Sequence, residues 1–190
     1  MLPKLIRVRR FGDDRGWFSE SYNAERFGKA GLGDVFVQDN HSFSAPKGTL
    51  RGLHFQTVPD AQAKLVRCTA GAIWDVAVDI RAGSPTRGRW VGARLTAEGG
   101  EQLYVPIGFA HGFVTLTEDV QVLYKASAVY APASEGAIRW DDPDLAIAWP
   151  LAGAAPILSG KDAAAPAFAD LTAAFSYEGD PLGDLEELIL

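Results

Sequence analysis

The chain has 190 residues, of which 47% are hydrophobic, and this length and content suit one domain around one buried core. Its formal net charge of −6 argues against a general nucleic-acid surface, because such surfaces need a sustained excess of lysine and arginine. Neither a secretory leader nor a membrane-spanning run is visible, so we expect no membrane partner. The only cysteine, Cys68, has no partner for a disulfide within the chain, which fits a reducing, cytoplasmic setting.

The first predicted element is a short helix. Asn23 can cap a helix over Ala24–Ala30, and Gly31 and Gly33 follow it as stop signals. We expect this helix to be an accessory to a structure built mainly from strands.

Strands are predicted from about Asp34 to Tyr130, where short runs rich in Val, Phe, Thr, Trp and Tyr are separated by Gly and Pro. Ala72–Ile80 is the clearest case, because apolar residues alternate there with a mixed set, at a period of two. This spacing of short strands favours a sandwich or barrel. Further strands are expected at Phe36–Gln38, Lys64–Thr69, Trp90–Thr96, Gln102–Val105, Gly112–Thr117 and Val120–Ala128.

Towards the C-terminus, alanine-rich Asp162–Ala174 and the leucines of Leu182–Leu190 have roughly helical spacing, so two more short helices are expected to pack on the sheets. No repeat, linker or break in composition divides the chain. We therefore predict one all-β domain over residues 1–190, with accessory helices mainly near the ends and a less diagnostic tail after residue 175.

His54 is the strongest candidate for acid–base chemistry among the three histidines. Alternation places it on one face with Gly52 and Gln56, while Leu53 and Phe55 point to the other face. An imidazole can accept and release a proton near neutral pH, which is what such a base must do. A structural histidine that is satisfied by hydrogen bonds is the alternative.

The other two histidines carry less information. His111 lies in an apolar, glycine-rich stretch that looks like a tight turn entering a strand, which favours a structural role, and His41 follows a polar strand end. A metal site would need three or four converging ligands, and these histidines with one cysteine fit that requirement poorly. We expect no metal.

Lys64 and Tyr124 are candidates for electrostatic and acid roles. Lys64 should face the same side of its strand as Val66 and Cys68, and if that side is the interior, its ammonium can stabilise an oxygen that becomes negative. A lysine at a strand end in water is the alternative. Tyr124 would ordinarily be a packing aromatic, but its phenol could also deliver a proton.

Phosphate binding would depend on arginines, because neither the dinucleotide fingerprint nor the Walker phosphate loop occurs. Arg15 and Arg51 could hold a diphosphate, and Phe18 could stack on a base. Surface arginines without a ligand are the alternative.

Several motifs occur together in a fixed order, and their combination is more specific than any one of them. They are Asp14-Arg15-Gly16, Val37-Gln38-Asp39-Asn40, Leu50-Arg51-Gly52-Leu53-His54-Phe55-Gln56, Ala63-Lys64-Leu65-Val66, the segment from Val76 to Pro85, Phe109-Ala110-His111-Gly112-Phe113, the segment from Asp142 to Pro150, and Leu158-Ser159-Gly160-Lys161-Asp162. On these motifs the chain resembles the dTDP-4-dehydrorhamnose 3,5-epimerase family over about nine-tenths of its length.

The resemblance implies a cupin-like jelly-roll barrel that works without a cofactor, as a homodimer whose N-terminal segments are exchanged between subunits. It implies a dTDP-sugar substrate and four catalytic positions, with His54 as base, Asp162 as its carboxylate partner, Lys64 beside the developing oxyanion and Tyr124 as proton donor. The substrate contacts that it implies are Arg15, Phe18, Glu20, Gln38, Asp39, Asn40, Arg51, His111, Tyr130, Glu135 and Lys161.

The implied reaction is epimerisation at C3 and C5 of dTDP-4-dehydro-6-deoxy-D-glucose, by removing a proton beside the C4 ketone and returning one to the opposite face. Three alternatives remain open at this point. The enzyme could act at C3 or C5 alone, it could be a ketoisomerase on the same barrel, or the barrel could bind sugars without catalysis.

Overall fold

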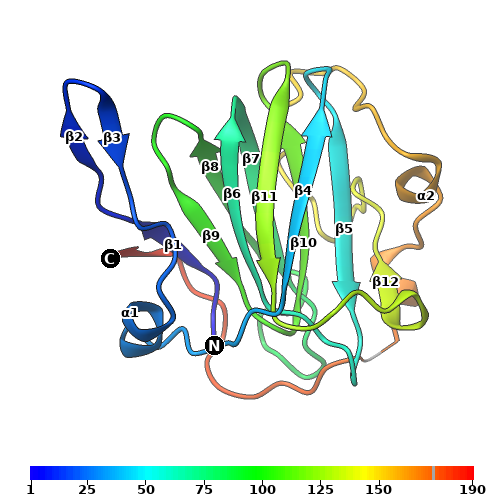
Figure 1. The fold of residues 1–190 in the computed structure, drawn as a ribbon. Coiled ribbons are helices and arrows are strands. Elements are labelled where there is room, and N and C mark those ends of the chain that lie inside the picture. The colour runs from blue at the N-terminus through cyan, green and yellow to red at the C-terminus, as the bar shows by residue number, and fades with distance from the viewer. Residues whose placement is uncertain (173) are drawn as a thin grey trace.

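The computed structural model describes residues 1–172 and 174–190, which form two β-sheets packed face to face (Figure 1). The six-stranded sheet has the order β13-β1-β9-β6-β11-β4 and the five-stranded sheet the order β12-β5-β10-β7-β8. The first sheet consists of β1 (Lys4–Arg7), β4 (Gln38–Ser44), β6 (Lys64–Ala70), β9 (Gln102–Val105), β11 (Val120–Ala126) and β13 (Glu186–Ile189). The second consists of β5 (Leu50–Gln56), β7 (Ala72–Asp79), β8 (Trp90–Thr96), β10 (Phe109–Thr115) and β12 (Glu135–Ala137).

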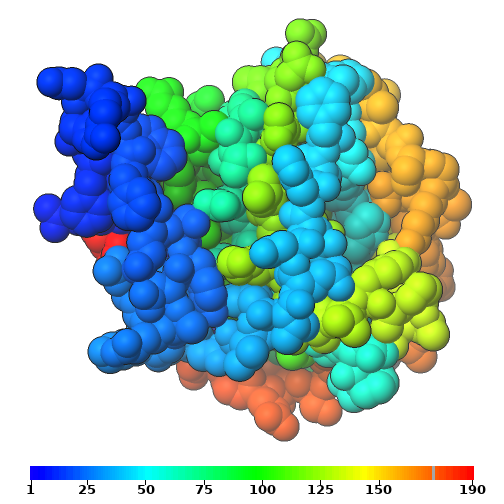
Figure 2. All heavy atoms as spheres, viewed as in Figure 1, coloured from blue at the N-terminus to red at the C-terminus, as the bar shows by residue number. Residues whose placement is uncertain are grey.

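The remaining elements are small. Strands β2 (Phe11–Asp13) and β3 (Gly16–Phe18) form a hairpin that projects from the body on the N-terminal side (Figures 1 and 2). The helical segments are α1 (Ala24–Lys29), η1 (Pro132–Ser134), α2 (Gly160–Ala163) and η2 (Phe168–Asp170). The all-β prediction with short accessory helices is confirmed.

The main core fills the space between the two sheets. On β7, Ile73 and Ala77 point into this space, whereas Val76 and Val78 point away from it into a second apolar layer. That second layer is formed by the chain that crosses the outside of the five-stranded sheet, including Ile138. Both faces of β7 are therefore buried, and polar side chains on its inner face lie inside the barrel. The inner core includes Val66, Cys68, Leu95, Leu103, Phe109, Phe113 and Val122.

Most predicted strands are confirmed, although two have shifted limits. Strand β4 runs over Gln38–Ser44 rather than Phe36–Gln38, and its inward side chains alternate with exposed ones along its whole length. Strand β10 begins at Phe109 rather than Gly112, because the stretch interpreted as a turn pairs residue by residue with β7. The helix at 24–30 is confirmed as α1, where the Asn23 side chain accepts a hydrogen bond from the amide of Arg26 at 3.1 Å.

The prediction of two C-terminal helices is wrong. Within Asp162–Ala174 only α2 and η2 are helical, and residue 173 lies outside the described residues. In the segment 182–190, Leu182 and Leu185 pack on the inner core, and Leu188 belongs to β13, which pairs in parallel with β1. Glu187 on β13 accepts a hydrogen bond from Arg7 at 2.7 Å, so backbone pairing and charge at the sheet edge outweigh the helical spacing of the leucines.

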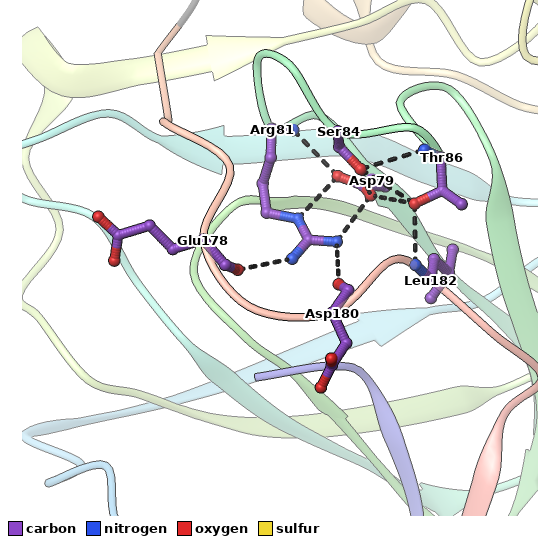
Figure 3. Close-up of polar contacts among 7 residues, drawn as sticks. All are labelled: Asp79, Arg81, Ser84, Thr86, Glu178, Asp180 and Leu182. Atoms are coloured by element: carbon purple, nitrogen blue, oxygen red, sulfur yellow. Dashed lines mark hydrogen bonds and ion pairs between the residues drawn. The ribbon is translucent and has the colours of Figure 1, made fainter.

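A buried ion pair holds the segment that leads to β13 (Figure 3). Arg81 donates to both oxygens of Asp79, at 2.9 and 2.8 Å, while Ser84 and Thr86 also donate to Asp79. Arg81 further donates to the carbonyls of Glu178 and Asp180, both at 3.3 Å, and the Thr86 hydroxyl accepts from the amide of Leu182 at 2.8 Å (Figure 3). Because these groups are buried and bonded, the tail is fixed to the body.

Candidate active site

A histidine and a carboxylate from different elements meet at the inner face of β5. Nε2 of His54 lies 2.6 Å from Oδ1 of Asp162, which is buried at the start of α2. The Ser159 hydroxyl caps this helix by accepting a hydrogen bond from the amide of Asp162 at 3.1 Å, and so fixes the carboxylate. Burial lowers the pKa of His54 and exceeds the opposing attraction of Asp162, while Lys64 and His111 lower it further. His54 is therefore neutral at pH 7, as a base must be.

An irregularity in β5 brings Arg51 to the same side as His54. Opposite β10, His54 pairs with His111 and Arg51 pairs with Phe113, so two residues of β5 face one residue of β10. Such a bulge changes the side to which the following side chains point. Arg51 consequently reaches across to β4, where its Nε donates to the hydroxyl of Ser44 at 3.1 Å.

Lys64 lies inside the barrel, on the side of Val66 and Cys68, as predicted. Its Nζ is 3.4 Å from the carbonyl oxygen of His54, and it forms no salt bridge within 4.0 Å with any described residue. Burial lowers the pKa of Lys64 to about 8, against the attraction of Asp75 and Glu135. An ammonium without a close counterion is available to an oxygen that gains negative charge.

Tyr124 faces the same interior from β11, in the sheet opposite to that of His54. It pairs with Val66 on β6 and packs against the inner core. Burial raises the pKa of its phenol, Glu135 raises it further, and Arg51 opposes this change. The phenol therefore carries its proton at neutral pH and can deliver it.

His111 is not in a turn but within β10, next to His54 in the sheet. Its Nε2 lies 2.7 Å from Oδ1 of Asp75 on β7, and both side chains are buried. The site thus contains a second imidazole–carboxylate pair. Asp75 is not among the site residues predicted from the sequence, because the burial of both faces of β7 depends on distant segments that cover its outer face.

Glu135, Tyr130 and Lys161 form a polar rim. The phenol of Tyr130 donates to Glu135 at 2.9 Å, and Lys161 forms an ion pair with the same carboxylate. Burial would raise the pKa of Glu135, but the hydrogen bonds from Lys161 and Tyr130 lower it, so the carboxylate is ionised at neutral pH.

Two glutamines position this rim. Gln38 on β4 accepts from the amide of Tyr130 at 2.9 Å and donates to Asn40 at 3.0 Å. Gln56 accepts from the amide of Ala131 at 2.9 Å and donates to the carbonyl of Val129 at 3.2 Å. A separate cavity of about 310 Å³ is lined by Arg51 and Asp162 together with Ser44 at the end of β4.

Four of the predicted contacts lie elsewhere in the chain. Arg15 and Phe18 are exposed on the β2–β3 hairpin, where Arg15 pairs with Asp13 at 2.5 Å. Glu20 pairs with Arg26 at 3.4 Å. Asp39 is exposed on β4, between the inward-facing Gln38 and Asn40, and it accepts from Lys125 at 2.9 Å. Within one chain, these four side chains do not join the cluster around His54.

No set of three or more His, Cys, Asp and Glu side chains among residues 1–172 and 174–190 is arranged to hold a metal ion. The expectation of a site without a metal stays a prediction. In the same described part of the chain, no helix is long and apolar enough to cross a membrane.

Inside this cupin-like β-barrel the structure brings together the side chains that an acid–base site requires: a histidine bonded to a carboxylate, a buried lysine, and a tyrosine on the sheet opposite the histidine. Residues 3–170 match the family model of dTDP-4-dehydrorhamnose 3,5-epimerase. The chain belongs to this family, so the resemblance found in the sequence is confirmed.

Individual relatives agree with this assignment. The chain is 53% identical to the dTDP-4-dehydrorhamnose 3,5-epimerase of Sinorhizobium fredii over 175 residues, which are 92% of this chain and 89% of the relative. The crystal structure of dTDP-6-deoxy-D-glucose-3,5-epimerase from Legionella pneumophila, in complex with dTDP-4-keto-L-rhamnose, is 44% identical with a TM-score of 0.87. The match covers 93% of this chain and all of that one. A 3′-monoepimerase from Streptomyces bikiniensis, in complex with dTDP-quinovose, is 38% identical with a TM-score of 0.82 over 88% of this chain and 84% of that one.

Proposed function

We propose that the protein epimerises dTDP-4-dehydro-6-deoxy-D-glucose at C3 and C5, giving dTDP-4-dehydro-L-rhamnose. The observation that carries the proposal is the placement of a base and an acid on opposite sheets. His54 lies on β5 with Asp162 behind it, and Tyr124 faces the same interior from β11. Inversion at carbon requires a proton to leave one face and return to the other, and this arrangement provides both groups.

Proton removal belongs to His54. Its Nε2 is bonded to Asp162, so Nδ1 is the nitrogen that takes the proton from the carbon beside the ketone. The C–H bond breaks, Nδ1 becomes protonated, and the electron pair moves to the ketone oxygen as an enolate. Asp162 stabilises the imidazolium that forms and fixes its orientation.

The enolate oxygen is stabilised by Lys64. The ammonium is buried and has no close carboxylate, so its charge acts in a medium of low polarity, where such an interaction is strong. Tyr124 then gives its proton to the carbon from the opposite face and regains one from water. His54, whose side chain is 31% exposed, returns its proton to solvent before the second carbon reacts.

The nucleotide part of the substrate would bind at the mouth of the barrel. Arg51, Gln38 and Asn40 offer donors to the diphosphate, and the rim of Tyr130, Glu135 and Lys161 lies beside them. The proposal includes a reducing, cytoplasmic setting, which the single cysteine supports and cell fractionation would test.

We further propose a homodimer in which the β2–β3 hairpin of each subunit reaches the site of the other. Trp17 and Phe18 are 59% and 70% exposed on this hairpin, and adjacent exposed aromatic side chains are typical of a surface that a partner covers. In such a dimer Arg15, Phe18 and Glu20 would complete the nucleotide site of the partner subunit.

The reaction is tested by incubating the protein with dTDP-4-keto-6-deoxyglucose in deuterium oxide and following label at C3 and C5 by NMR. Label at both carbons supports the proposal, and absence of label refutes it for this substrate. His54→Ala should abolish exchange and leave nucleotide binding largely intact. Near-normal exchange in that variant would remove His54 from its role.

A second candidate is epimerisation at C3 alone. A 3′-monoepimerase shares the fold at 38% identity, but the 3,5-epimerases compared above are 44% and 53% identical, which favours the main proposal. The same experiment separates the two, because this candidate requires label at C3 and none at C5.

The dimer is tested by mixing two inactive variants, His54→Ala and Arg15→Ala, after unfolding and refolding them together. If hairpins are exchanged, each mixed dimer contains one site with both residues intact, so about one quarter of all sites should recover. If the hairpin serves its own chain, no site recovers and the exchange is refuted. In the control, Arg139→Ala replaces Arg15→Ala, because Arg139 is an exposed arginine outside the site.

A further inference from the structure

Asp75 is a buried carboxylate inside the barrel that the mechanism above does not use. Its side chain is fully buried on the inner face of β7, between Ile73 and Ala77. One oxygen accepts from His111 at 2.7 Å. The other oxygen, Oδ2, is buried and has no hydrogen-bond partner among the described residues.

A buried carboxylate with one bonded oxygen is costly unless a positive charge compensates it. Lys64 is a buried cation of the same interior, and among the described residues no carboxylate lies within 4.0 Å of its ammonium. It sits on β6, in the sheet facing β7. Asp75 is the carboxylate that most strongly favours the charged form of this lysine, ahead of Glu135.

We propose that Asp75 is a positioning residue of the site, which keeps Lys64 an ammonium and holds the His111 imidazole in one orientation. This inference rests on the proposed function, in which Lys64 must be charged to stabilise the enolate. Asp75 acts through the other two residues and does not itself touch the substrate.

Other charges surround Lys64, and they decide how specific the test is. The carbonyl of His54 on β5 lies 3.4 Å from its Nζ, and Glu135 on β12 also favours its charged form. The remaining titratable groups of the site are His111 on β10, Tyr124 on β11 and Asp162 on α2. Of the acids, Asp162 is bonded to His54, and Glu135 is engaged by Lys161 and Tyr130 at the rim. Among these three acids, Asp75 is the one with a buried oxygen, Oδ2, that has no hydrogen-bond partner among the described residues.

The orientation of His111 follows from the same bond. Because Nε2 faces a carboxylate, it carries a hydrogen, and Nδ1 is left for a different partner. Without the carboxylate, the ring could turn over or change tautomer. The structure therefore assigns Asp75 two effects, one on charge and one on geometry.

The variant that tests the proposal is Asp75→Asn, which keeps the size of the side chain and removes its charge. The basic limb of the profile of kcat/KM against pH should move down by roughly one pH unit, because Lys64 loses its proton more easily. Relative to its own maximum, activity at pH 9 should then be about tenfold lower than in the wild-type protein. An unmoved basic limb overturns the proposal.

The matched control is Asp34→Asn. Asp34 accepts a hydrogen bond from the buried phenol of Tyr104. Tyr104 pairs with Leu65, and both pack on the face of the sheet opposite to that of Lys64. The substitution removes the same charge outside the barrel, so its basic limb should stay at the wild-type position. A shift equal to that of Asp75→Asn would show a general effect of net charge and overturn the proposal.

A second variant keeps the proposal testable if Asp75→Asn does not fold. His111→Gln removes the imidazole and keeps the carboxylate of Asp75, so the pKa of Lys64 should be no lower than in the wild type. The measurement is ¹⁵N NMR of the lysine ammonium groups, with the signal of Lys64 assigned by its loss in Lys64→Met. A lower value overturns the proposal. Failure of the proposed function is distinct, because wild-type protein would then show no exchange at any pH.

Discussion

Replacing Asp162 by asparagine should slow proton removal by roughly 100-fold. The carboxylate of Asp162 is buried, and its bond to His54 is short, at 2.6 Å. A hydrogen bond to a charged group contributes about 1.5–3 kcal/mol, and burial places this pair at the upper end of the range. Since each 1.36 kcal/mol is a factor of ten in rate, the upper end corresponds to about 100-fold.

The acid limb of the pH profile should change in the same variant. Asp162 opposes the effect of burial on the pKa of His54, so removing its charge lowers that pKa further and shifts the acid limb to lower pH. The assay is solvent deuterium exchange across a pH series, with Asp141→Asn as the control, because that carboxylate pairs with Arg139 at the surface. Unchanged rate and acid limb in Asp162→Asn would refute the dyad.

Three other predictions follow from the same structure. The profile of wild-type kcat/KM against pH should be bell-shaped. The value should fall below the lowered pKa of His54, where the base becomes protonated, and above about pH 8, where Lys64 loses its proton. A flat profile from pH 5 to 9 would contradict this assignment. Tyr124→Phe should retain exchange from one face and lose inverted product, as NMR of the product would show, and full epimerisation would move the acid elsewhere. Arg81→Met should lower the free energy of unfolding in urea by about 3–5 kcal/mol, because Asp79 stays buried without its counterion, whereas Arg139→Met at the surface should change it by less than about 1 kcal/mol.

The strands and the inner site could be predicted from sequence because both follow a period of two. Lys64 faces inward with Val66, and His54 faces inward opposite Leu53, as alternation requires. Arg51 breaks that period, since the bulge in β5 depends on pairing with β10, which is far away in the sequence. Local patterns contain no information on such pairing.

The C-terminal part could not be predicted for a related reason. The leucines of 182–190 fit a helix locally, but the Thr86 hydroxyl accepts from the amide of Leu182, and β13 pairs with the distant β1. Asp75 was overlooked because an acid on a mixed face reads as solvent-exposed until the chain that covers β7 is known. In both cases contacts between distant segments decide the outcome.

The pairing of β13 with β1 also orders events in time. The last residue, Leu190, accepts a hydrogen bond from the amide of Arg9 at 3.0 Å and donates to the carbonyl of Arg7 at 2.8 Å, just before the β2–β3 hairpin begins. Strand β1 therefore receives this neighbour only after β13, which follows it in the chain, has been synthesised. Subunits that exchange this hairpin would accordingly assemble from chains that already contain β13, and a chain without β13 would present the hairpin on a loosened base.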